Sequence, residues 1–197
     1  DLFLVQVQAL LQANAISATV DGGIARVMLP MVTTVEELRE AKTLLSDTLG
    51  KAFQEIEFGI MVEVPAAAMA LKDMVKEVDF VSVGTNDLAQ YLFAVDRDNP
   101  WVANLYQPYH PALLRTLRYI AKTCQRAGVP SSVCGEMAGH RAGALFLAGA
   151  GFDGLSMAPP FVGEIKALLR ETDFESLRIL SSEAALCTTS GESFGML

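Results

Sequence analysis

The chain has 197 residues, 51% of them apolar, which is enough for one sizeable core in a single soluble domain. Its 15 Lys and Arg against 23 Asp and Glu give a net charge of −8, which argues against nucleic acid or an anionic membrane as a partner. The three cysteines have neither metal-ligand spacing nor the even number of a disulfide framework, so a reducing, cytoplasmic location is expected. No apolar run reaches the ~20 residues of a membrane span.

Helical and strand periodicities alternate along the chain. Two local signals support the boundaries: Thr34 with Glu37 forms a capping-box pattern, and Pro65 suits the first turn of a helix. The predicted elements, in order, are a helix over 2–14, a turn at 21–23, a strand over 24–30, a helix over roughly 35–49, a strand over 56–63, a helix from 65, a strand over 80–84, a short helix from 86, an irregular segment over 96–110, a helix over 111–127, a strand over 131–134, a helix over 142–150, a strand over 154–157 and a helix over 161–170.

Five strand-helix units in succession imply parallel strands joined by right-handed crossovers, and hence an α/β fold. A complete (β/α)8 TIM-type barrel takes ~250 residues. We therefore expect residues 1–186 to form part of such a barrel, about its last five units, with the other strands preceding Asp1. Residues 187–197 show neither period and are expected to form a loose C-terminal tail.

Polar groups and glycines follow the predicted strands at their carboxyl ends, the edge at which α/β folds carry ligands. Glu63 ends one strand and Asp87 follows the next, so the two carboxylates should converge. Such a pair suits a hydrated Mg²⁺ ion. The alternative is structural: Glu63 pairs with a buried arginine and Asp87 caps a helix.

Two arginines are candidates for binding an anion. Arg97 lies in the long irregular segment, where it could bind phosphate or carboxylate or simply be solvated. Arg26 lies within a predicted strand, and its charge must face either an anion inside the barrel or an acidic partner.

Cys134 stands between an apolar strand and Gly135. Its thiol could act as a nucleophile after ionisation or, in the protonated form, as a proton donor. Cys124, inside a helix pattern, and Cys187 are expected to be structural or incidental, and His110 is expected to pack or cap at a helix start.

Several ordered stretches resemble one known family. They are G-I-M-V-E-V-P-A-A-A, K-E-V-D-F-V-S-V-G-T-N-D-L-A-Q-Y, A-V-D-R-D-N, L-Y-Q-P-Y-H-P-A-L-L-R, C-G-E-M-A-G and G-L-S-M. Together they resemble the C-terminal phosphoenolpyruvate-binding domain of enzyme I of the bacterial phosphotransferase system, from about residue 2 to 180. The resemblance implies a phosphoenolpyruvate-protein phosphotransferase.

The resemblance also implies roles for seven residues. Glu63 and Asp87 would bind Mg²⁺, Asn86 and Arg97 would contact the substrate's phosphate and carboxylate, and Arg26 would be a further cation on the phosphate side. Cys134 would protonate the methylene carbon of enolpyruvate, and Gly135 would leave room for the substrate.

The implied partners are phosphoenolpyruvate and pyruvate, the histidine phosphocarrier protein and a second copy of the chain in a homodimer. The acceptor histidine of the family matches neither His110 nor His140, and two of its phosphate-binding arginines belong to strands before Asp1. The segment alone is therefore expected to be inactive and to bind phosphoenolpyruvate weakly or not at all. His140 also replaces the aspartate usual after C-G-E-M-A-G.

Two other functions stay open. One is a Mg²⁺-dependent, enolate-forming carbon–carbon lyase of the related barrel type, and the other is a non-catalytic phosphoenolpyruvate sensor that dimerises. The sequence does not separate the sugar, fructose and nitrogen-related branches of the phosphotransferase system.

Overall fold

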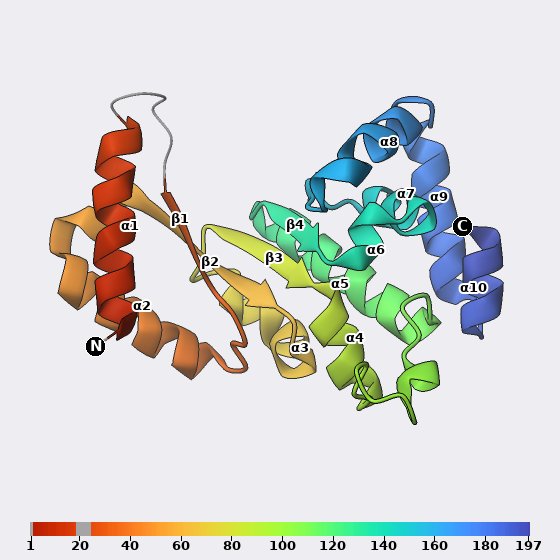
Figure 1. Cartoon of the computed structure of the whole chain (residues 1–197), viewed down its shortest axis with the longest axis horizontal. Coiled ribbons are helices and arrows are strands. Elements are labelled where there is room, and N and C mark those ends of the chain that lie inside the picture. Colours follow the sequence, from red (N-terminus) through yellow and green to blue (C-terminus); the bar gives the residue numbers. More distant parts are fainter. Residues whose placement is uncertain (1, 19–24) are drawn as a thin grey trace.

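The computed structural model describes residues 2–18 and 25–197, and the turn predicted at 21–23 lies outside them. Along the long axis of the molecule, α1 and α10 lie at opposite ends (Figure 1). The elements in chain order are α1 (Leu2–Ala18), β1 (Ala25–Leu29), α2 (Val35–Leu49), the 3-10 helix η1 (Gly50–Glu55), β2 (Ile56–Val62), α3 (Pro65–Met74), β3 (Phe80–Gly84), α4 (Thr85–Phe93), the 3-10 helix η2 (Ala103–Leu105), α5 (Pro111–Ala127), β4 (Ser131–Cys134), α6 (Glu136–Gly139), α7 (Arg141–Ala150), β5 (Gly154–Leu155), α8 (Pro159–Arg170), α9 (Phe174–Leu186) and α10 (Ser190–Met196).

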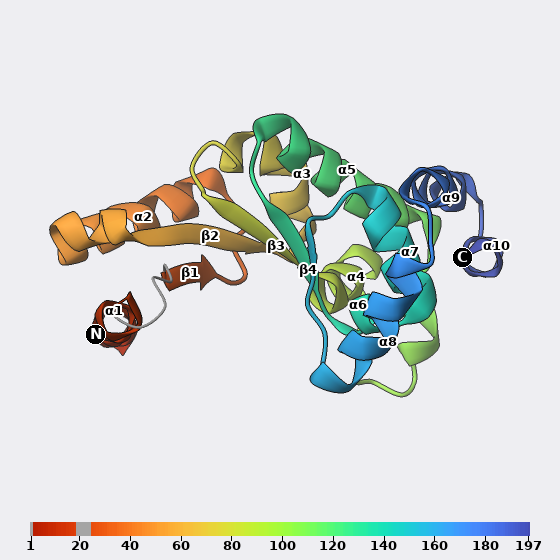
Figure 2. The same ribbon diagram turned by 90° about the horizontal axis from the view of Figure 1, so that it is seen from above.

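The five strands form one parallel sheet in the order β1-β2-β3-β4-β5. Each strand pairs with the next one along the chain, so every connection passes over the same side of the sheet. Figure 2 shows α2, α3 and α5 along that side. The α/β class and the parallel sheet predicted from the sequence are confirmed.

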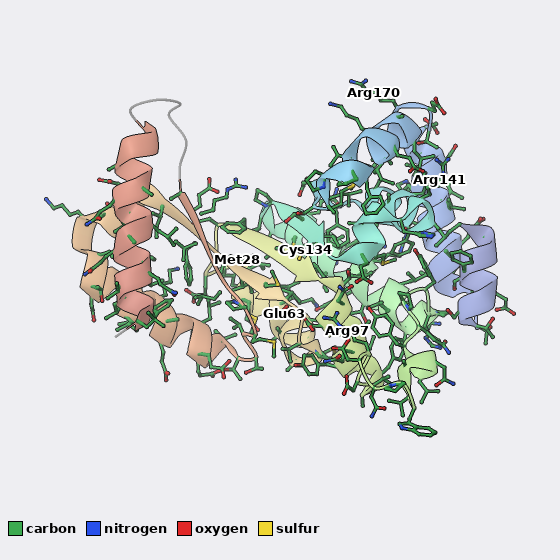
Figure 3. The ribbon with its side chains drawn as sticks, viewed as in Figure 1. Met28, Glu63, Arg97, Cys134, Arg141 and Arg170 are labelled. Carbon is green, nitrogen blue, oxygen red and sulfur yellow. The ribbon has the colours of Figure 1, made fainter. Side chains whose placement is uncertain are left out.

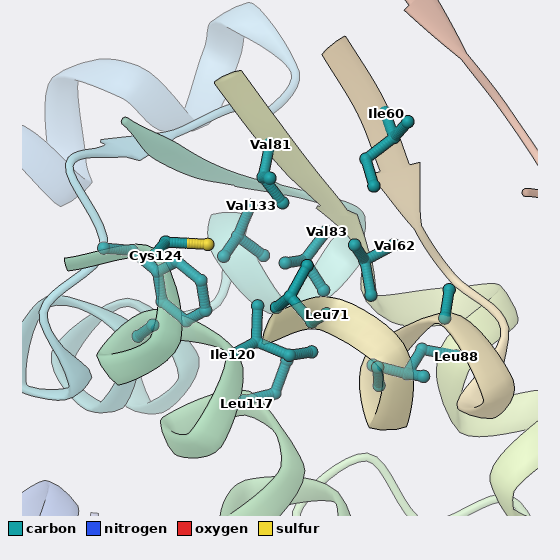
Figure 4. Packing of buried hydrophobic residues seen from close by; sticks show 14 of the residues in the cluster. Ile60, Val62, Leu71, Val81, Val83, Leu88, Leu117, Ile120, Cys124 and Val133 are labelled. Carbon is teal, nitrogen blue, oxygen red and sulfur yellow. The ribbon is translucent and has the colours of Figure 1, made fainter. Parts of the chain in front are cut away.

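The core lies between the sheet and these helices. Alternate residues of the strands, among them Ile60, Val83 and Val133, are fully buried. They pack with side chains such as Leu71 and Ile120 from the helices in one continuous cluster (Figure 4). This arrangement fixes the register of the sheet, because slipping one strand by a residue would turn its core side chains to the opposite face.

The opposite face of the sheet is more polar and more open. The side chain of Met28 is 36% exposed, and Arg26 pairs with Glu57 on the neighbouring strand. Strand alternation places Glu63 and Cys134 on this same face, nearer its carboxyl end. The face that carries the candidate site is therefore the one that the core helices leave uncovered.

Local capping explains several boundaries that the sequence predicted correctly. Thr34 and Glu37 form the complete capping box of α2, and Pro65 occupies the first turn of α3. His110 is the N-cap of α5, where its Nδ1 accepts the N–H of Ala112. Its expected role as a packing or capping residue is confirmed.

Three expectations for the C-terminal part were wrong. Strand β5 has two residues rather than four, helix α9 was not foreseen, and the loose tail is in fact helix α10. Thr189 and Glu192 form a second capping box, and the buried Ser193 hydroxyl donates to Ala184 O at 2.9 Å. This short helix packs against α9, which stabilises it.

Within residues 2–18 and 25–197, no helix is both long and apolar enough to span a bilayer.

Candidate functional site

The carboxyl ends of β2, β3 and β4 bring the predicted site residues to one rim. Val62 is level with Val83, and Gly84 is level with Cys134, so Glu63 and Cys134 flank the end of β3 from either side. At the usual strand spacing their backbones are about 10 Å apart. A Cβ at Gly84 would lie 2.7 Å from Glu63 Oε2, so only a glycine leaves this floor free. Figure 3 labels Glu63, Arg97 and Cys134 in this central region.

Glu63 is a buried carboxylate, with 3% of the residue exposed. Its Oε1 accepts the backbone N–H of Met31 at 2.8 Å, which crosses from the end of β1. Burial raises the pKa of Glu63, the Met31 N–H lowers it in part, and the neighbouring Asp87 carboxyl raises it further. No cation among the described residues is paired with Glu63, so the alternative of a buried arginine partner is not supported.

Asp87 lies in the first turn of α4 and faces both Glu63 and Arg97. The nearest atoms of the ion pair, Arg97 Nη2 and Asp87 Oδ1, are 3.9 Å apart. Arg97 Nη1 is buried and has no hydrogen-bond partner within the described part of the chain. A guanidinium with one buried, unpaired nitrogen and one loosely paired nitrogen is suited to bind an anion at those two nitrogens.

Tyr106 is a further member of this group that the sequence analysis did not single out. Burial raises the pKa of its hydroxyl, while the adjacent Arg97 opposes that rise. The carboxylates of Glu136 and Asp87 also act on the hydroxyl. The phenol therefore stays protonated at neutral pH and can orient the arginine. The motif L-Y-Q-P contained the residue, but nothing in the spacing related it to Arg97.

The carboxylate pair fits a hard divalent cation. Within the described residues, no group of three or more His, Cys, Asp or Glu side chains could hold a metal, so the protein would supply two carboxylates. Two carboxylates with the other positions left to waters and ligand oxygens is the usual environment of Mg²⁺. A cation beside Glu63 and Asp87 would also remove the mutual repulsion that raises the pKa of Glu63.

Cys134 is half-buried, and its thiol is close to two polar groups of β3. Its Sγ–H donates to Val83 O at 3.5 Å, and the Ser82 hydroxyl lies 3.9 Å from the sulfur. The role expected for Cys134 is that of a proton donor, and its thiol group can supply a proton. Cys124, by contrast, is fully buried in α5, in agreement with a structural role.

Gly135 also has a structural role beside the expected one. Its φ of 115° is a conformation that a side chain disfavours. A Cβ there would collide with Thr85 Oγ1 and would lie 3.1 Å from Asn86 Oδ1. The glycine therefore makes room for the start of α4, whose Thr85 hydroxyl donates to Cys134 O at 2.9 Å.

Arg26 is not brought to the rim. It is level with Glu57, six residues before Glu63 on β2, toward the amino ends of the strands. Its Nε lies 2.6 Å from Glu57 Oε2, and the guanidinium lies 5.3 Å from the Phe80 ring centroid. Of the two alternatives for this charge, the structure favours the acidic partner.

Cys134 opens into a cavity of about 490 Å³. The cavity is shared by β4, α4, α6 and α8, and its lining includes Asn86, Gly135, His140 and Phe161. A smaller cavity of about 190 Å³ adjoins it and shares Asn86, Glu136 and His140. The rim thus combines a carboxylate pair, a partly unpaired arginine and a thiol beside a cavity large enough for a small organic anion.

These features define an α/β domain with a ligand site at the carboxyl edge of a parallel sheet. Residues 1–174 match the family described as the PEP-binding domain of PEP-utilising enzymes, and the chain belongs to that family.

Named relatives agree with this assignment. A protein of Escherichia coli K12 called phosphoenolpyruvate-dependent phosphotransferase system is 41% identical over 198 residues, which are 95% of this chain and 26% of the relative. The phosphoenolpyruvate-protein phosphotransferase of Lactococcus lactis subsp. lactis is 40% identical over 199 residues, which are 97% of this chain and 34% of the relative. The chain therefore spans about a quarter to a third of these relatives.

A solved structure shows the same fold. A citrate lyase from Burkholderia xenovorans LB400 superimposes with a TM-score of 0.57 over 81% of this chain and 55% of the lyase chain, at 22% sequence identity. The likeness concerns the fold alone.

Proposed function

We propose that the chain is the phosphoenolpyruvate-binding part of a phosphoenolpyruvate-protein phosphotransferase. One observation carries the proposal: the partly unpaired Arg97 and the Glu63–Asp87 pair lie on the other side of Gly84 from the Cys134 thiol. A phosphorylated three-carbon enol acid has an anion at one end and a methylene carbon at the other. That spacing of charges and proton donor suits such a substrate.

The sheet would then be one arc of a (β/α)8 barrel. The sequential strand order and the helices on one side are compatible with a barrel, and the polar face with Arg26 and Glu57 would line its interior. In the longer relatives the chain corresponds to only a part of the length, so the other strands would come from outside residues 1–197.

The chain's residues would act on the enol end of the substrate. As the bond between the enol oxygen and phosphorus breaks, the phosphoryl group passes to a histidine outside this chain and the electron pair of that bond stays on the enol oxygen. The methylene carbon then forms a C–H bond with the proton of Cys134, which gives pyruvate and a thiolate that regains its proton from water. Arg97 and Asn86 would hold the substrate's anionic groups.

Glu63 and Asp87 would hold Mg²⁺, which when bound neutralises charge on the phosphate and enol oxygens. The wider assembly would include the histidine phosphocarrier protein as the next phosphoryl acceptor and a second copy of the chain. A cytoplasmic location fits such a reaction.

Binding can be tested on the chain itself by NMR. Titration with phosphoenolpyruvate to about ten millimolar, with Mg²⁺ present, should shift the amide signals of Asn86, Gly135 and Cys134, and Arg97→Ala should abolish these shifts. The exposed Trp101, 89% accessible, provides a matched control, since Trp101→Ala should leave them unchanged. The high concentration is needed because the segment alone is expected to bind weakly. Shifts of the same size in Arg97→Ala would contradict the proposal.

A further inference from the structure

Three aromatic rings meet beside the cavity that Cys134 lines. The ring centroids of Tyr109 and His140 are 5.8 Å apart, those of Tyr109 and Phe194 5.0 Å, and those of His140 and Phe194 6.1 Å. Tyr109 precedes α5, His140 joins α6 to α7, and Phe194 belongs to α10. The cluster therefore connects the C-terminal helix to the wall of the candidate site.

The hydroxyl of Tyr109 lies between two groups. The backbone N–H of Gly143, in the first turn of α7, faces its oxygen, and His140 Nδ1 lies 2.9 Å away. Burial raises the pKa of Tyr109 to about 12, so the hydroxyl keeps its proton at neutral pH. With the Gly143 N–H facing the oxygen, we assign the hydroxyl proton to His140 Nδ1, the tautomer in which Tyr109 is the donor.

An imidazole that accepts at Nδ1 carries its own proton on Nε2. His140 lines both the larger cavity, with Cys134 and Asn86, and the smaller one. In this assignment the hydrogen bond from Tyr109 orients the ring and makes Nε2 the donor.

We propose that His140 is a hydrogen-bond donor for small anions in the cavity beside Cys134, and that Tyr109 and Phe194 of α10 are its positioning residues. The donor itself does not depend on the proposed function; only the identity of the anion, phosphoenolpyruvate, rests on it.

The charges around His140 give the donor a specific task. Glu136 lines the same two cavities and repels anions, whereas the neighbouring Arg141 is engaged with Glu164 at 3.0 Å. A hydrogen-bond donor fixed in place can offset the effect of Glu136 on a bound anion.

The thiol provides a direct assay, because Cys134 can be alkylated with anionic iodoacetate or with neutral iodoacetamide of nearly the same size. Rates at each cysteine are measured by peptide mass spectrometry on the full chain at one fixed pH. The half-buried Cys187 is the internal reference, since it lies outside the cavity, and the buried Cys124 should not react. The ratio of the two rates at Cys134, divided by the ratio at Cys187, isolates the preference for an anion.

His140→Phe keeps an aromatic ring and removes the donor, so the normalised ratio should fall about 3- to 10-fold. Tyr109→Phe and Phe194→Ala should lower the normalised ratio as well. Phe194→Tyr, which keeps an aromatic ring, and Trp101→Ala should give the ratio of the unmodified chain. An unchanged ratio in His140→Phe would refute the donor. A lowered ratio in His140→Phe alone would refute the positioning by Tyr109 and α10.

Protection of Cys134 by phosphoenolpyruvate with Mg²⁺ separates this inference from the proposed function. If the variants change the ratio but phosphoenolpyruvate protects Cys134 equally in Arg97→Ala, the substrate assignment fails and the anion donor stands. If phosphoenolpyruvate protects but the ratio is the same in every variant, the donor fails and the substrate assignment stands.

Discussion

The backbone N–H of Met31 donates to Glu63 Oε1 at 2.8 Å, across 32 positions of sequence. Met31 adopts a φ of 56°, a left-handed conformation unusual for a residue with a side chain. The end of β1 is thus held in a costly conformation by the carboxylate that is the candidate metal ligand. Such outliers gather at functional sites, where the surrounding structure enforces them.

Replacement of Met31 should reveal this cost. Met31 is exposed, so its side chain contributes little burial, and glycine adopts positive φ without strain. Met31→Gly should be more stable than Met31→Ala by roughly 0.5–1 kcal/mol, because the alanine keeps the strain. Urea unfolding monitored by circular dichroism measures the difference. Equal stability of the two variants would show that the conformation is not strained.

Mg²⁺ should stabilise the folded chain through the carboxylate pair. A ligand that binds only the folded state raises stability in proportion to the logarithm of its concentration above the dissociation constant. Thermal unfolding should therefore shift upward by a few degrees in about 10 mM MgCl₂, and Glu63→Gln or Asp87→Asn should remove the shift. The same concentration of CaCl₂ tests selectivity, and Glu164→Gln is a control for the loss of a surface carboxylate. A shift that survives in Glu63→Gln would place the cation elsewhere.

The two capping boxes show how far the sequence predicts the helices. Thr34–Glu37 precedes a strongly amphipathic helix that its sequence predicts, whereas Thr189–Glu192 has the same spacing but precedes a short helix, rich in serine and glycine, whose sequence shows no period. Its stability comes from contacts with α9, and sequence periodicity carries no information about such contacts. The Thr189–Glu192 capping box is visible in the sequence, but no helical periodicity follows it.

The site shows a similar division. Glu63, Asp87 and Cys134 could be placed on one rim because parallel strands end at the same edge. Arg26 could not be placed, because strand alternation gives the face of a side chain but not its distance from the edge of the sheet. Tyr106 was missed because it reaches Arg97 through the fold of an irregular segment.

The second capping box can be tested locally. Thr189→Ala should remove a cap worth about 1 kcal/mol from α10. Amides over 190–196 should then exchange with solvent about 5-fold faster, while amides of α5 stay unchanged, because a terminal helix can open without global unfolding. Hydrogen exchange followed by NMR measures both. Faster exchange throughout the chain would mean that α10 is part of the cooperative core.

The buried thiol of Cys124 predicts a dependence of stability on pH. Burial, with a smaller effect of Asp153, raises the pKa of Cys124 to about 12. Between the ordinary thiol pKa of the unfolded chain and about 12, the folded state binds the proton more tightly, so stability is complete below that window and falls as pH rises through it. The slope for one group approaches about 1.4 kcal/mol per pH unit. Cys124→Ala should lose this component, so the stability difference between the two proteins should shrink from pH 8 to pH 10.5 in urea unfolding.

Gly135 and Gly151 form a matched pair for separating backbone strain from steric collision. Both have positive φ, 115° and 97°, but a Cβ at Gly151 would meet no atom within 4 Å, whereas one at Gly135 would collide with Thr85 Oγ1. Gly151→Ala should cost about 1–2 kcal/mol from strain alone, and Gly135→Ala about 1–3 kcal/mol more because α4 must move. That movement should also displace Asn86, so Gly135→Ala should shift the Asn86 side-chain NMR signals while Gly151→Ala leaves them in place. Equal losses of stability in urea, with Asn86 undisturbed, would show that the close contact between Gly135 and α4 does not position the site.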